Sequence, residues 1–240
     1  MNKKGILGIL VAIVVVFVAS FVVSSYYLND NVICVLPAST SASTNASGVL
    51  GSNELGSVVK KGPYGNKSSP VKIAYITGVH PLEHESHEAI RESIENKNKS
   101  LNYCYYVYEV NVTKDAADYD KGRMNGQLLA QQFVVPDIKG KNFKLAVDVH
   151  SNRGNYQEKR FIFAPQEDPS SKAIALSIKN KIQWMVYYNP PSQTSPKYVT
   201  IPIIESGIPS VVYETYINDT YAFTKSHANE FVSAVDSLKL

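Results

Sequence analysis

Apolar, β-branched runs alternate with charged, helix-like runs from residue 68 to the end of this chain. The runs with the character of strands lie at 71–79, 103–112, 143–150, 159–165 and 208–215. The runs with helical character lie at 84–99, 122–134, 169–183 and 221–240. This regular alternation predicts a three-layer α/β sandwich with a mostly parallel mixed sheet. Pro136 predicts that the second helix stops before it.

A different kind of segment precedes this domain. Residues 5–23 are apolar and uncharged, and Lys3 and Lys4 come before them. About 18 or more apolar residues can span a bilayer, whereas a cleaved signal peptide has an apolar region of about 7–15. We expect one N-terminal transmembrane helix, a signal anchor over 5–25, with residues 1–4 as a cytoplasmic tip and the rest extracytoplasmic at the cell membrane. Cleavage after the span is the alternative, and it also leaves the domain outside the cytoplasm.

The segment between the anchor and the domain differs from both in composition. Its central part, 37–57, is rich in Ser, Thr, Ala and Gly and poor in large apolar side chains. Such a segment cannot bury enough apolar surface to offset the entropy lost on ordering the chain. We therefore expect a flexible tether over 26–67 and a catalytic domain over 68–240.

Charge and cysteine content exclude some classes of protein. The chain has 24 Lys and Arg against 21 Asp and Glu, a net charge of +3, and without Lys3 and Lys4 the balance is 22 against 21. A nucleic-acid-binding protein usually carries a basic stripe or a high positive charge, so no nucleic-acid partner is expected. Cys34 and Cys104 are too few for a disulfide framework or a multi-cysteine zinc site, and are either separate thiols or one disulfide.

Three predicted strands end in residues that can bind a metal or move a proton. The first is followed by His80 and Glu83, the third ends in His150, and the last ends in Glu214. Because functional residues of parallel sheets gather beyond the carboxyl ends of the strands, these side chains are expected to meet. Two imidazoles and one carboxylate are a common ligand set for catalytic zinc. His80, Glu83 and His150 are therefore the predicted ligands of one Zn²⁺, and Glu214 is the predicted general base.

This ordered set resembles the zinc carboxypeptidase superfamily, which includes the deacylases of succinylglutamate and N-acetylaspartate. The residues that carry the resemblance are Gly78-Val79-His80-Pro81-Leu82-Glu83, then Asp148-Val149-His150-Ser151, then a strand that ends in Glu214. The resemblance covers roughly residues 70–240 and implies the same zinc ligands and the same base. The domain is shorter than a full-length carboxypeptidase, which implies that loops shaping specificity are absent or different.

The resemblance also implies arginines that hold the substrate carboxylate and stabilise the oxyanion. A planar guanidinium suits this task because it pairs with carboxylates through two hydrogen bonds. Arg153, three residues after His150, and Arg123, between the two ligand segments, are the candidates. The order Gly-Arg123-Met-Asn125 departs from the usual Asn-Arg order of the family. Asn152 is the third predicted substrate-binding residue.

The remaining histidines are expected to lie at the surface. His84 and His87 are three residues apart, whereas the His-Glu-x-x-His zinc motif has its histidines four apart. Both are therefore expected on a solvated helix face, and His227 is expected at the surface of the last helix.

Two acidic residues and one serine leave alternatives open. Glu205 is the rival of Glu214 as base, but it precedes a predicted helix end, whereas Glu214 follows a β-branched run. Asp148 could orient a histidine ligand through a hydrogen bond, or could cap a neighbouring loop. Ser151 is not expected to act as a nucleophile, because no base is left for it once His150 binds a metal.

These expectations predict a membrane-anchored, extracytoplasmic zinc hydrolase that cleaves a peptide, or a peptide of the cell envelope, with metal-activated water. Its expected partners are that substrate and the membrane. Two alternatives stay open. One is a zinc-dependent deacylase of small N-acyl amino acids, and the other is a non-catalytic surface module with the same fold.

Overall fold

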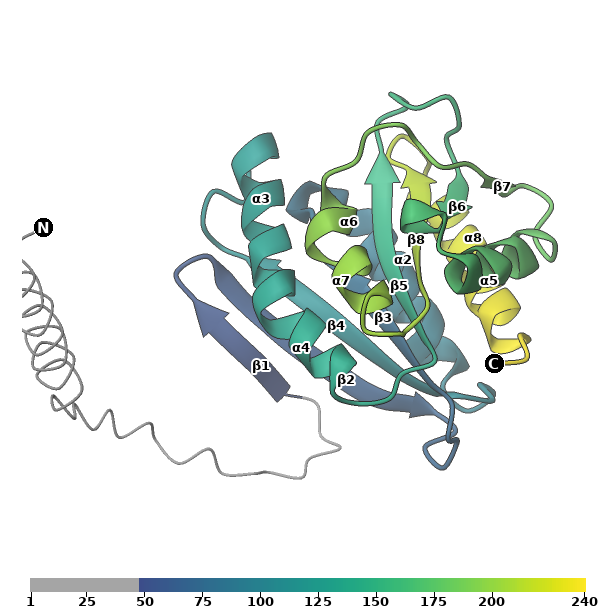
Figure 1. Ribbon diagram of the computed structural model, residues 1–240. Coiled ribbons are helices and arrows are strands. Elements are labelled where there is room, and N and C mark those ends of the chain that lie inside the picture. The colour runs from purple at the N-terminus through teal and green to yellow at the C-terminus, as the bar shows by residue number, and fades with distance from the viewer. Residues whose placement is uncertain (1–47) are drawn as a thin grey trace, which may run out of the picture. The chain divides into compact units, whose positions relative to one another are not determined.

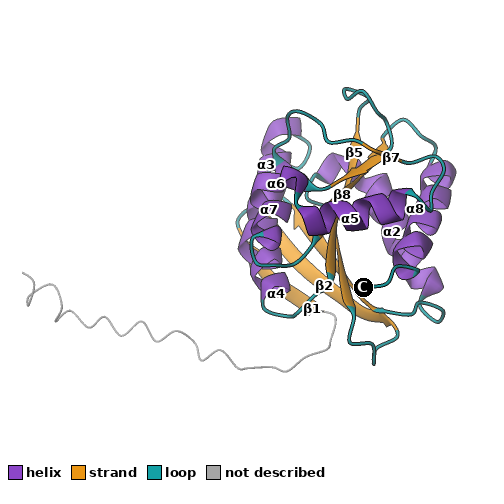
Figure 2. Cartoon of the chain, turned by 45° about the vertical axis from the view of Figure 1, so that its right-hand side comes forward, coloured by secondary structure: helices purple, strands orange, loops and turns teal. Residues whose placement is uncertain are grey.

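The computed structural model describes residues 48–240, which contain one eight-stranded sheet with helices on both faces (Figures 1 and 2). The predicted transmembrane helix at 5–25 and the first part of the predicted tether lie outside the described residues. Within residues 48–240, no helix has the length and apolar character needed to cross a membrane.

Every element expected over residues 68–240 is present, together with several short ones. The strands are β1 (Gly48–Asn53), β2 (Gly56–Gly65), β3 (Lys72–Thr77), β4 (Cys104–Val112), β5 (Leu145–Asn152), β6 (Phe161–Phe163), β7 (Val186–Tyr187) and β8 (Ser210–Tyr216). The α-helices are α2 (His84–Lys97), α3 (Tyr119–Leu129), α4 (Val135–Lys139), α5 (Pro169–Lys179), α6 (Ser195–Tyr198), α7 (Thr200–Ile204) and α8 (Tyr221–Asp236). Single turns of other helix types are η1 (Pro81–Glu83), η2 (Ala130–Val134) and η3 (Pro165–Glu167).

The order of the strands in the sheet is β1-β2-β4-β3-β5-β8-β6-β7. The central strands β4, β3, β5 and β8 are parallel, while β1–β2, β2–β4 and β6–β8 are antiparallel. The predicted mixed, mostly parallel sheet is confirmed. The chain runs from β3 to β4 on one side and then returns to β5 on the other side. In open α/β sheets, ligand sites form beyond the carboxyl ends of the strands at such a reversal.

Alternate residues of the central strands face two separate hydrophobic cores. Ile73 and Tyr75 of β3 pack with apolar residues of α2, α5 and α8 on one face. Ala74 and Ile76 pack with residues of α3, η2, α4 and α7 on the other face. Successive side chains of a strand point to opposite faces, so both faces of this sheet are apolar and both need a helical cover. The predicted three-layer sandwich is confirmed, and Figure 2 shows the helices on either side of the strands.

Two strands lie inside the segment that composition predicted to be a tether. β1 and β2 form an antiparallel hairpin, and β2 pairs with β4 from Gly56 opposite Val112 to Gly65 opposite Cys104. The prediction of a flexible tether is therefore wrong for residues 48–65. Its physical basis was the lack of large apolar side chains, but this hairpin is held mainly by backbone hydrogen bonds to an existing sheet edge.

The helix predicted at 122–134 differs from the observed one at both ends. It begins at Tyr119, because the Asp118 side chain accepts hydrogen bonds from the backbone N–H groups of Asp120 and Lys121. It also does not stop before Pro136, since the π-helical turn η2 leads directly into α4. Pro136 is the second residue of α4, directly after the π-helical turn, so the continuing helix takes up a residue without a backbone N–H where its hydrogen-bond pattern already changes.

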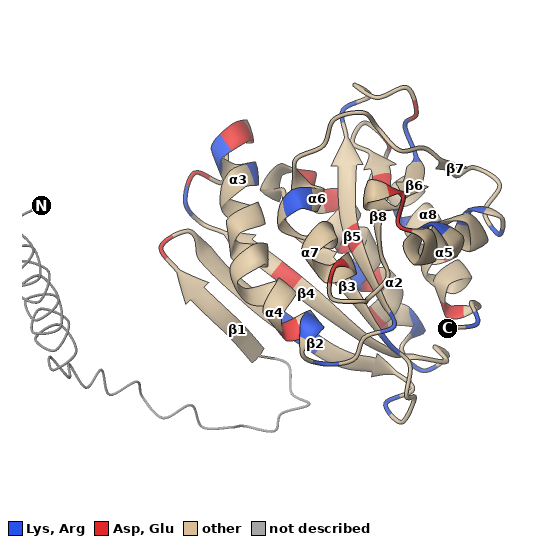
Figure 3. Cartoon of the chain, viewed as in Figure 1, with Lys and Arg blue, Asp and Glu red and all other residues tan. Residues whose placement is uncertain are grey.

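Many charged residues lie on helices, loops and near the ends of strands (Figure 3). Two carboxylates among the described residues are fully buried, those of Glu83 and Asp148, with 5% and 0% of their surface exposed. A buried carboxylate is costly unless a cation or hydrogen-bond donors compensate it. Both residues lie at the carboxyl-end edge of the sheet, next to β3 and within β5.

Candidate active site

The carboxyl ends of β3, β5 and β8 bring the predicted ligands and the predicted base together. β3 and β5 are adjacent parallel strands, and η1 places Glu83 directly after His80 at the end of β3. His150 lies in β5 in register with Glu214 of the neighbouring strand β8. Residues up to 134 positions apart in the sequence therefore meet at one edge of the sheet.

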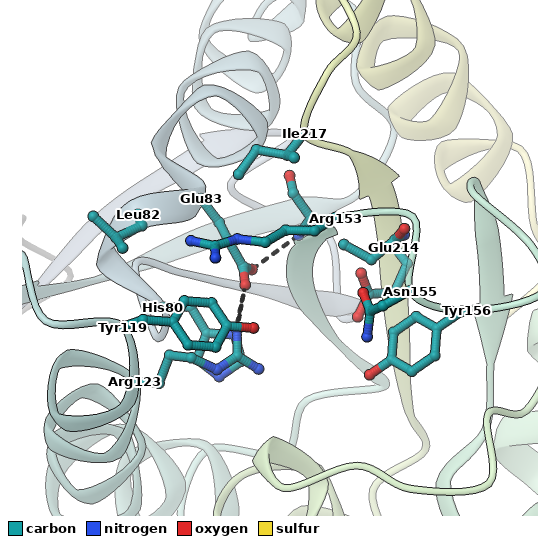
Figure 4. Close-up of a pocket in the computed structure, with 12 residues that line it drawn as sticks. His80, Leu82, Glu83, Tyr119, Arg123, Arg153, Asn155, Tyr156, Glu214 and Ile217 are labelled. Atoms are coloured by element: carbon teal, nitrogen blue, oxygen red, sulfur yellow. Dashed lines mark hydrogen bonds and ion pairs between the residues drawn. The ribbon is translucent and has the colours of Figure 1, made fainter.

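Glu83 lies between the two histidines, and Figure 4 shows it beside His80. His80 Nδ1 is 2.9 Å from Glu83 Oε1, and His150 Nδ1 is 3.1 Å from Glu83 Oε2. The backbone N–H of Ser151 also donates to Glu83 Oε2, at 2.9 Å. One coordinating atom from each of the three side chains lies within 4.8 Å of the other two. The cluster is thus a candidate metal site.

The donor set of this cluster fits zinc. Zinc binds histidine nitrogen and carboxylate oxygen at about 2.0–2.2 Å, so the ligand atoms of a tetrahedral site lie about 3.3–3.5 Å apart. The two histidine–glutamate separations, 2.9 Å and 3.1 Å, are near that spacing. Asp148 Oδ1 and Glu214 Oε2 are shielded from solvent and have no hydrogen-bond partner. Buried carboxylate oxygens without a partner favour a cation beside them.

Each of the three predicted ligand side chains shifts the pKa of at least one of the others. Burial lowers the pKa of His80 to about 4, against the attraction of Glu83, so its imidazole is neutral at pH 7. Burial opposes ionisation of Glu83, but the two histidines outweigh it and hold the pKa of Glu83 well below its usual range. Burial likewise opposes protonation of His150, but Asp148 and Glu83 hold the pKa of His150 well above its usual range. Metal binding at His150 must therefore displace a proton.

Glu214, the predicted base, is a further carboxylate that lines the pocket. Burial raises the pKa of Glu214 to about 8; nearby His150 opposes this shift and Glu83 adds to it. A carboxylate that titrates near neutral pH can accept and release a proton, and the Oε2 atom of Glu214 has no hydrogen-bond partner that would prevent this. The rival Glu205 is exposed at the end of α7 and does not line the pocket that Glu214 lines.

Two arginines border the pocket beside the cluster (Figure 4). Arg123 donates a hydrogen bond to Glu83 Oε1 at 2.7 Å, which ties it to a predicted ligand. Arg153 is exposed and has no ion pair among the described residues, and its guanidinium carbon lies 4.0 Å from the centre of the Tyr119 ring. Stacking fixes the plane of this guanidinium while leaving its donors available to an anion.

Two polar residues of β5 support the site. Asp148 Oδ2 is 3.0 Å from His150 Nε2, the contact that the first of the two alternatives for Asp148 requires. The side-chain amide of Asn152 donates to the backbone carbonyls of Lys159 and Thr215, both at 2.8 Å. Asn152 also lines the pocket, but its donors are engaged in holding the strand end, so substrate contact by Asn152 stays a prediction.

Two histidines expected at the surface are buried. His87 is 9% exposed, and its Nε2 lies 3.2 Å from the carbonyl oxygen of Val149. His227 is 7% exposed, and its ring centre lies 3.8 Å from that of Trp184 and 4.1 Å from that of Phe223. Both surface predictions are wrong. They rested on the polarity of the imidazole, but a polar side chain can be buried where a hydrogen-bond or ring partner lies next to it, and the sequence does not show that partner.

Close packing of α3 against the end of β3 delivers further side chains to the site. A Cβ atom at Gly126 would lie 2.0 Å from the backbone oxygen of Val79, the residue before His80. Only glycine permits this approach of helix to backbone. The approach places Arg123 and Gln127, on the same helix, against Glu83 and His80 respectively.

Substitution of Gly126 by alanine is expected to destabilise the protein by about 2–4 kcal/mol, although alanine is the better helix former by about 1 kcal/mol. The added methyl group must push α3 away from the end of β3 and carry Arg123 and Gln127 with it. Thermal unfolding of the metal-free protein measures the loss. Gly140→Ala is the matched control, because its new Cβ meets its nearest neighbour at an ordinary 3.5 Å. Equal stability of the two variants would contradict the argument.

Several residues at the site were not expected from the sequence. Tyr119 and Tyr156 line the pocket, and Gln127 and Ser195 contact the ligand histidines. Asp118, an aspartate that can cap a helix, indicated that the helix begins at Tyr119. Tyr156 is one of sixteen tyrosines and Ser195 follows an irregular segment, so nothing in the sequence distinguishes either one.

No family model and no curated protein matches this sequence. The solved structures with a similar fold include these three. The metallo-carboxypeptidase from Pseudomonas aeruginosa has a TM-score of 0.50 and 15% identity, and the match covers 79% of this chain and 62% of that one. Succinylglutamate desuccinylase/aspartoacylase from Rhodobacter sphaeroides has a TM-score of 0.52 and 17% identity, and the match covers 75% of this chain and 56% of that one. The cell shape determinant protein Csd4 from Helicobacter pylori has a TM-score of 0.50 and 12% identity, and the match covers 74% of this chain and 53% of that one.

This chain has the metallocarboxypeptidase-like fold. The resemblance expected from the sequence is thus confirmed as a likeness of fold. The chain spans only 53–62% of the length of the three structures, at 12–17% identity. These matches include both a carboxypeptidase and a deacylase. The fold therefore does not identify the reaction, and the residues of the site must do so.

Proposed function

We propose that this protein is a zinc-dependent hydrolase that cleaves a peptide amide bond. The observation that carries the proposal is the buried cluster of His80, Glu83 and His150 beside Glu214, whose buried Oε2 atom has no hydrogen-bond partner. Three protein ligands leave a coordination position for water or substrate, whereas structural zinc sites use four. The arrangement favours a catalytic role over a structural one.

Each residue of the site has one task in the proposed reaction. When bound, zinc supplies a Lewis acid that polarises the scissile carbonyl and acidifies water. Glu214 accepts the proton of the attacking water and delivers it to the leaving nitrogen. Arg123, next to Glu83, provides positive charge where the carbonyl oxygen gains negative charge in the transition state. Arg153, at the pocket rim, binds a substrate carboxylate.

Glu214 must be ionised to act as a base, and the adjacent cluster determines whether it is. Without a cation, burial holds the pKa of Glu214 at about 8. A divalent cation nearby favours the ionised carboxylate and lowers this pKa. The base therefore becomes available in the metal-loaded protein.

The test is metal content and turnover of the purified full-length chain. About one zinc per chain is expected, with release of a new amine from short peptides. Removal of the metal with a chelator should abolish the release, and added zinc should restore it. A protein that binds no zinc when zinc is supplied, or that holds zinc without turnover of any amide, contradicts the proposal and favours the surface-module alternative.

Substitution of Arg153 by alanine is expected to raise KM for a peptide with a free C-terminal carboxylate by about 10–100-fold, because a charged hydrogen bond of about 1.5–3 kcal/mol is lost. Steady-state kinetics on the free acid and on the same peptide with an amidated C-terminus measures this effect. The amidated peptide should not distinguish wild type from variant.

Arg153→Lys is the matched variant for that experiment, since it keeps the charge but loses the planar fork. It should restore only part of the affinity for the free acid. An equal increase in KM for the free acid and the amide in Arg153→Ala would show that Arg153 does not bind the carboxylate.

Deacylation of a small N-acyl amino acid is the second candidate reaction. The fold match to succinylglutamate desuccinylase/aspartoacylase, with a TM-score of 0.52, supports considering it. It uses the same ligands and base and differs in the substrate. Turnover of N-acyl amino acids without turnover of peptides would favour the deacylase.

We also propose that residues 5–25 anchor the protein in the cell membrane and that the domain lies outside the cytoplasm. The support is the uncharged apolar run behind Lys3 and Lys4. A peptide of the cell envelope is then the substrate within reach, and one similar structure, Csd4, is a cell shape determinant solved with a bound tripeptide. Membrane fractionation, with protease added to intact cells, tests the anchor and its orientation.

A further inference from the structure

The outer nitrogen of His150 belongs to a buried group of three polar side chains. His150 Nε2 is 3.0 Å from Asp148 Oδ2. The hydroxyl of Ser195, at the start of α6, donates to the same oxygen at 3.1 Å and lies 3.3 Å from His150 Nε2. The three residues are 0–5% exposed, so water does not compete for these bonds.

The outer nitrogen of His80 has a parallel arrangement. His80 Nε2 is 3.2 Å from Gln127 Nε2, and Gln127 Nε2 is 3.1 Å from the hydroxyl of Thr194. Gln127 is 1% exposed, and its Oε1 has no hydrogen-bond partner. Thr194, which precedes Ser195 in the sequence, therefore contacts Gln127, the side chain beside His80.

The position of the imidazole protons determines what these contacts do. A histidine that binds a metal through Nδ1 carries its hydrogen on Nε2. For His150, the carboxylate of Asp148 accepts that hydrogen. For His80, the acceptor must be Gln127 Oε1, which takes the place of Nε2 when the carboxamide turns by half a rotation. Oε1 then accepts from both His80 and the Thr194 hydroxyl, and the amide nitrogen moves to the position where Oε1 has no partner.

We propose that Thr194 and Ser195 form one clasp that positions both histidines for metal binding, an inference that rests on the proposed metal site. Neither side chain contacts the coordinating Nδ1 atoms, so both are positioning residues. Because they are consecutive, one short segment before and at the start of α6 sets the orientation of two ligands that come from two different strands. Ser195 precedes Pro196, which restricts the backbone of this segment.

The experiment compares zinc affinity of the full-length wild type with Thr194→Val and Ser195→Ala, by competition with a chromophoric chelator. Each variant is expected to raise the zinc Kd by about 10–100-fold, the usual effect of losing a partner of a metal-binding histidine. Substitution of zinc by Co²⁺ gives a second readout, because its visible absorption spectrum reports ligand geometry. Both variants are expected to shift this spectrum.

Two controls separate positioning from folding. Thr194→Ser keeps the hydroxyl and should retain the wild-type Kd. Ser93→Ala removes a hydroxyl that is buried like that of Ser195 and is bonded to the Ala89 carbonyl in α2, and it should leave the Kd unchanged. Unfolding of the metal-free proteins is measured alongside.

The outcomes distinguish this inference from the proposed function. Wild type that binds zinc, with Thr194→Val and Ser195→Ala that bind it equally well, overturns the clasp and leaves the proposed hydrolase intact. Lower stability of the metal-free variants with unchanged Kd and Co²⁺ spectrum also overturns it, because the role is then only structural. Wild type that binds no zinc overturns both.

Discussion

Replacement of Glu214 by glutamine is expected to lower kcat by about 10²–10⁴-fold, the usual contribution of a general base. Glutamine has nearly the same shape but cannot accept a proton from water at neutral pH. The zinc content should remain at the wild-type value, because Glu214 is not among the clustered ligands. Steady-state kinetics together with elemental analysis of the same preparation measures both quantities.

Glu205→Gln is the matched control for this prediction. Glu205 is an exposed glutamate at the end of α7, outside the pocket. Its substitution should leave kcat unchanged. Full activity of Glu214→Gln, or an equal loss in both variants, would remove Glu214 from the mechanism.

The stability of Glu214→Gln in the metal-free state should change with pH in a definite direction. Burial raises the pKa of Glu214 from 4.5 to about 8, so the folded wild type binds this proton more tightly than the unfolded chain. The resulting stabilisation is complete below about pH 4.5 and is lost as the pH rises to about 8. Glutamine does not ionise, so the variant should gain on wild type across this window by on the order of 2–4 kcal/mol. Thermal unfolding at pH 5 and pH 8 measures the change, and no change would contradict it.

Replacement of His150 by alanine is expected to abolish zinc binding at micromolar metal. Loss of one of three ligands should raise the zinc Kd by at least about 10²–10³-fold, since each ligand carries several kcal/mol of the binding free energy. The buried Glu83 and Asp148 also lose a cationic partner, which should destabilise the fold by about 3–5 kcal/mol. Elemental analysis, with circular dichroism to confirm folding, measures the result.

His84→Ala is the control, because His84 is exposed and is adjacent to Glu83 in the sequence. It should retain about one zinc per chain. The protein used must include residues 48–65, because they form β1 and β2 of the sheet. Zinc retained by His150→Ala at wild-type affinity would mean that the metal lies elsewhere.

Periodicity was sufficient to predict the main elements of the fold. A sheet that is covered on both faces needs strands that are apolar throughout. The sequence shows such apolar runs at β3, β4, β5 and β8, so these strands can be recognised from it. The hairpin of β1 and β2 was missed for the opposite reason. Its side chains are mostly small or half-buried, and its pairing with β4 depends on backbone groups that every sequence has.

The sequence by itself determined that His80, Glu83, His150 and Glu214 would meet. Each one ends or directly follows an apolar strand, and parallel strands place their carboxyl ends at one edge of the sheet. Only the tertiary structure decided that Arg123 binds Glu83, that His87 turns inward, and that Thr194 and Ser195 support the two histidines. These contacts depend on how closely α3, α2 and α6 approach the strands. That approach is set by packing between segments distant in the sequence, which no local pattern of residues encodes.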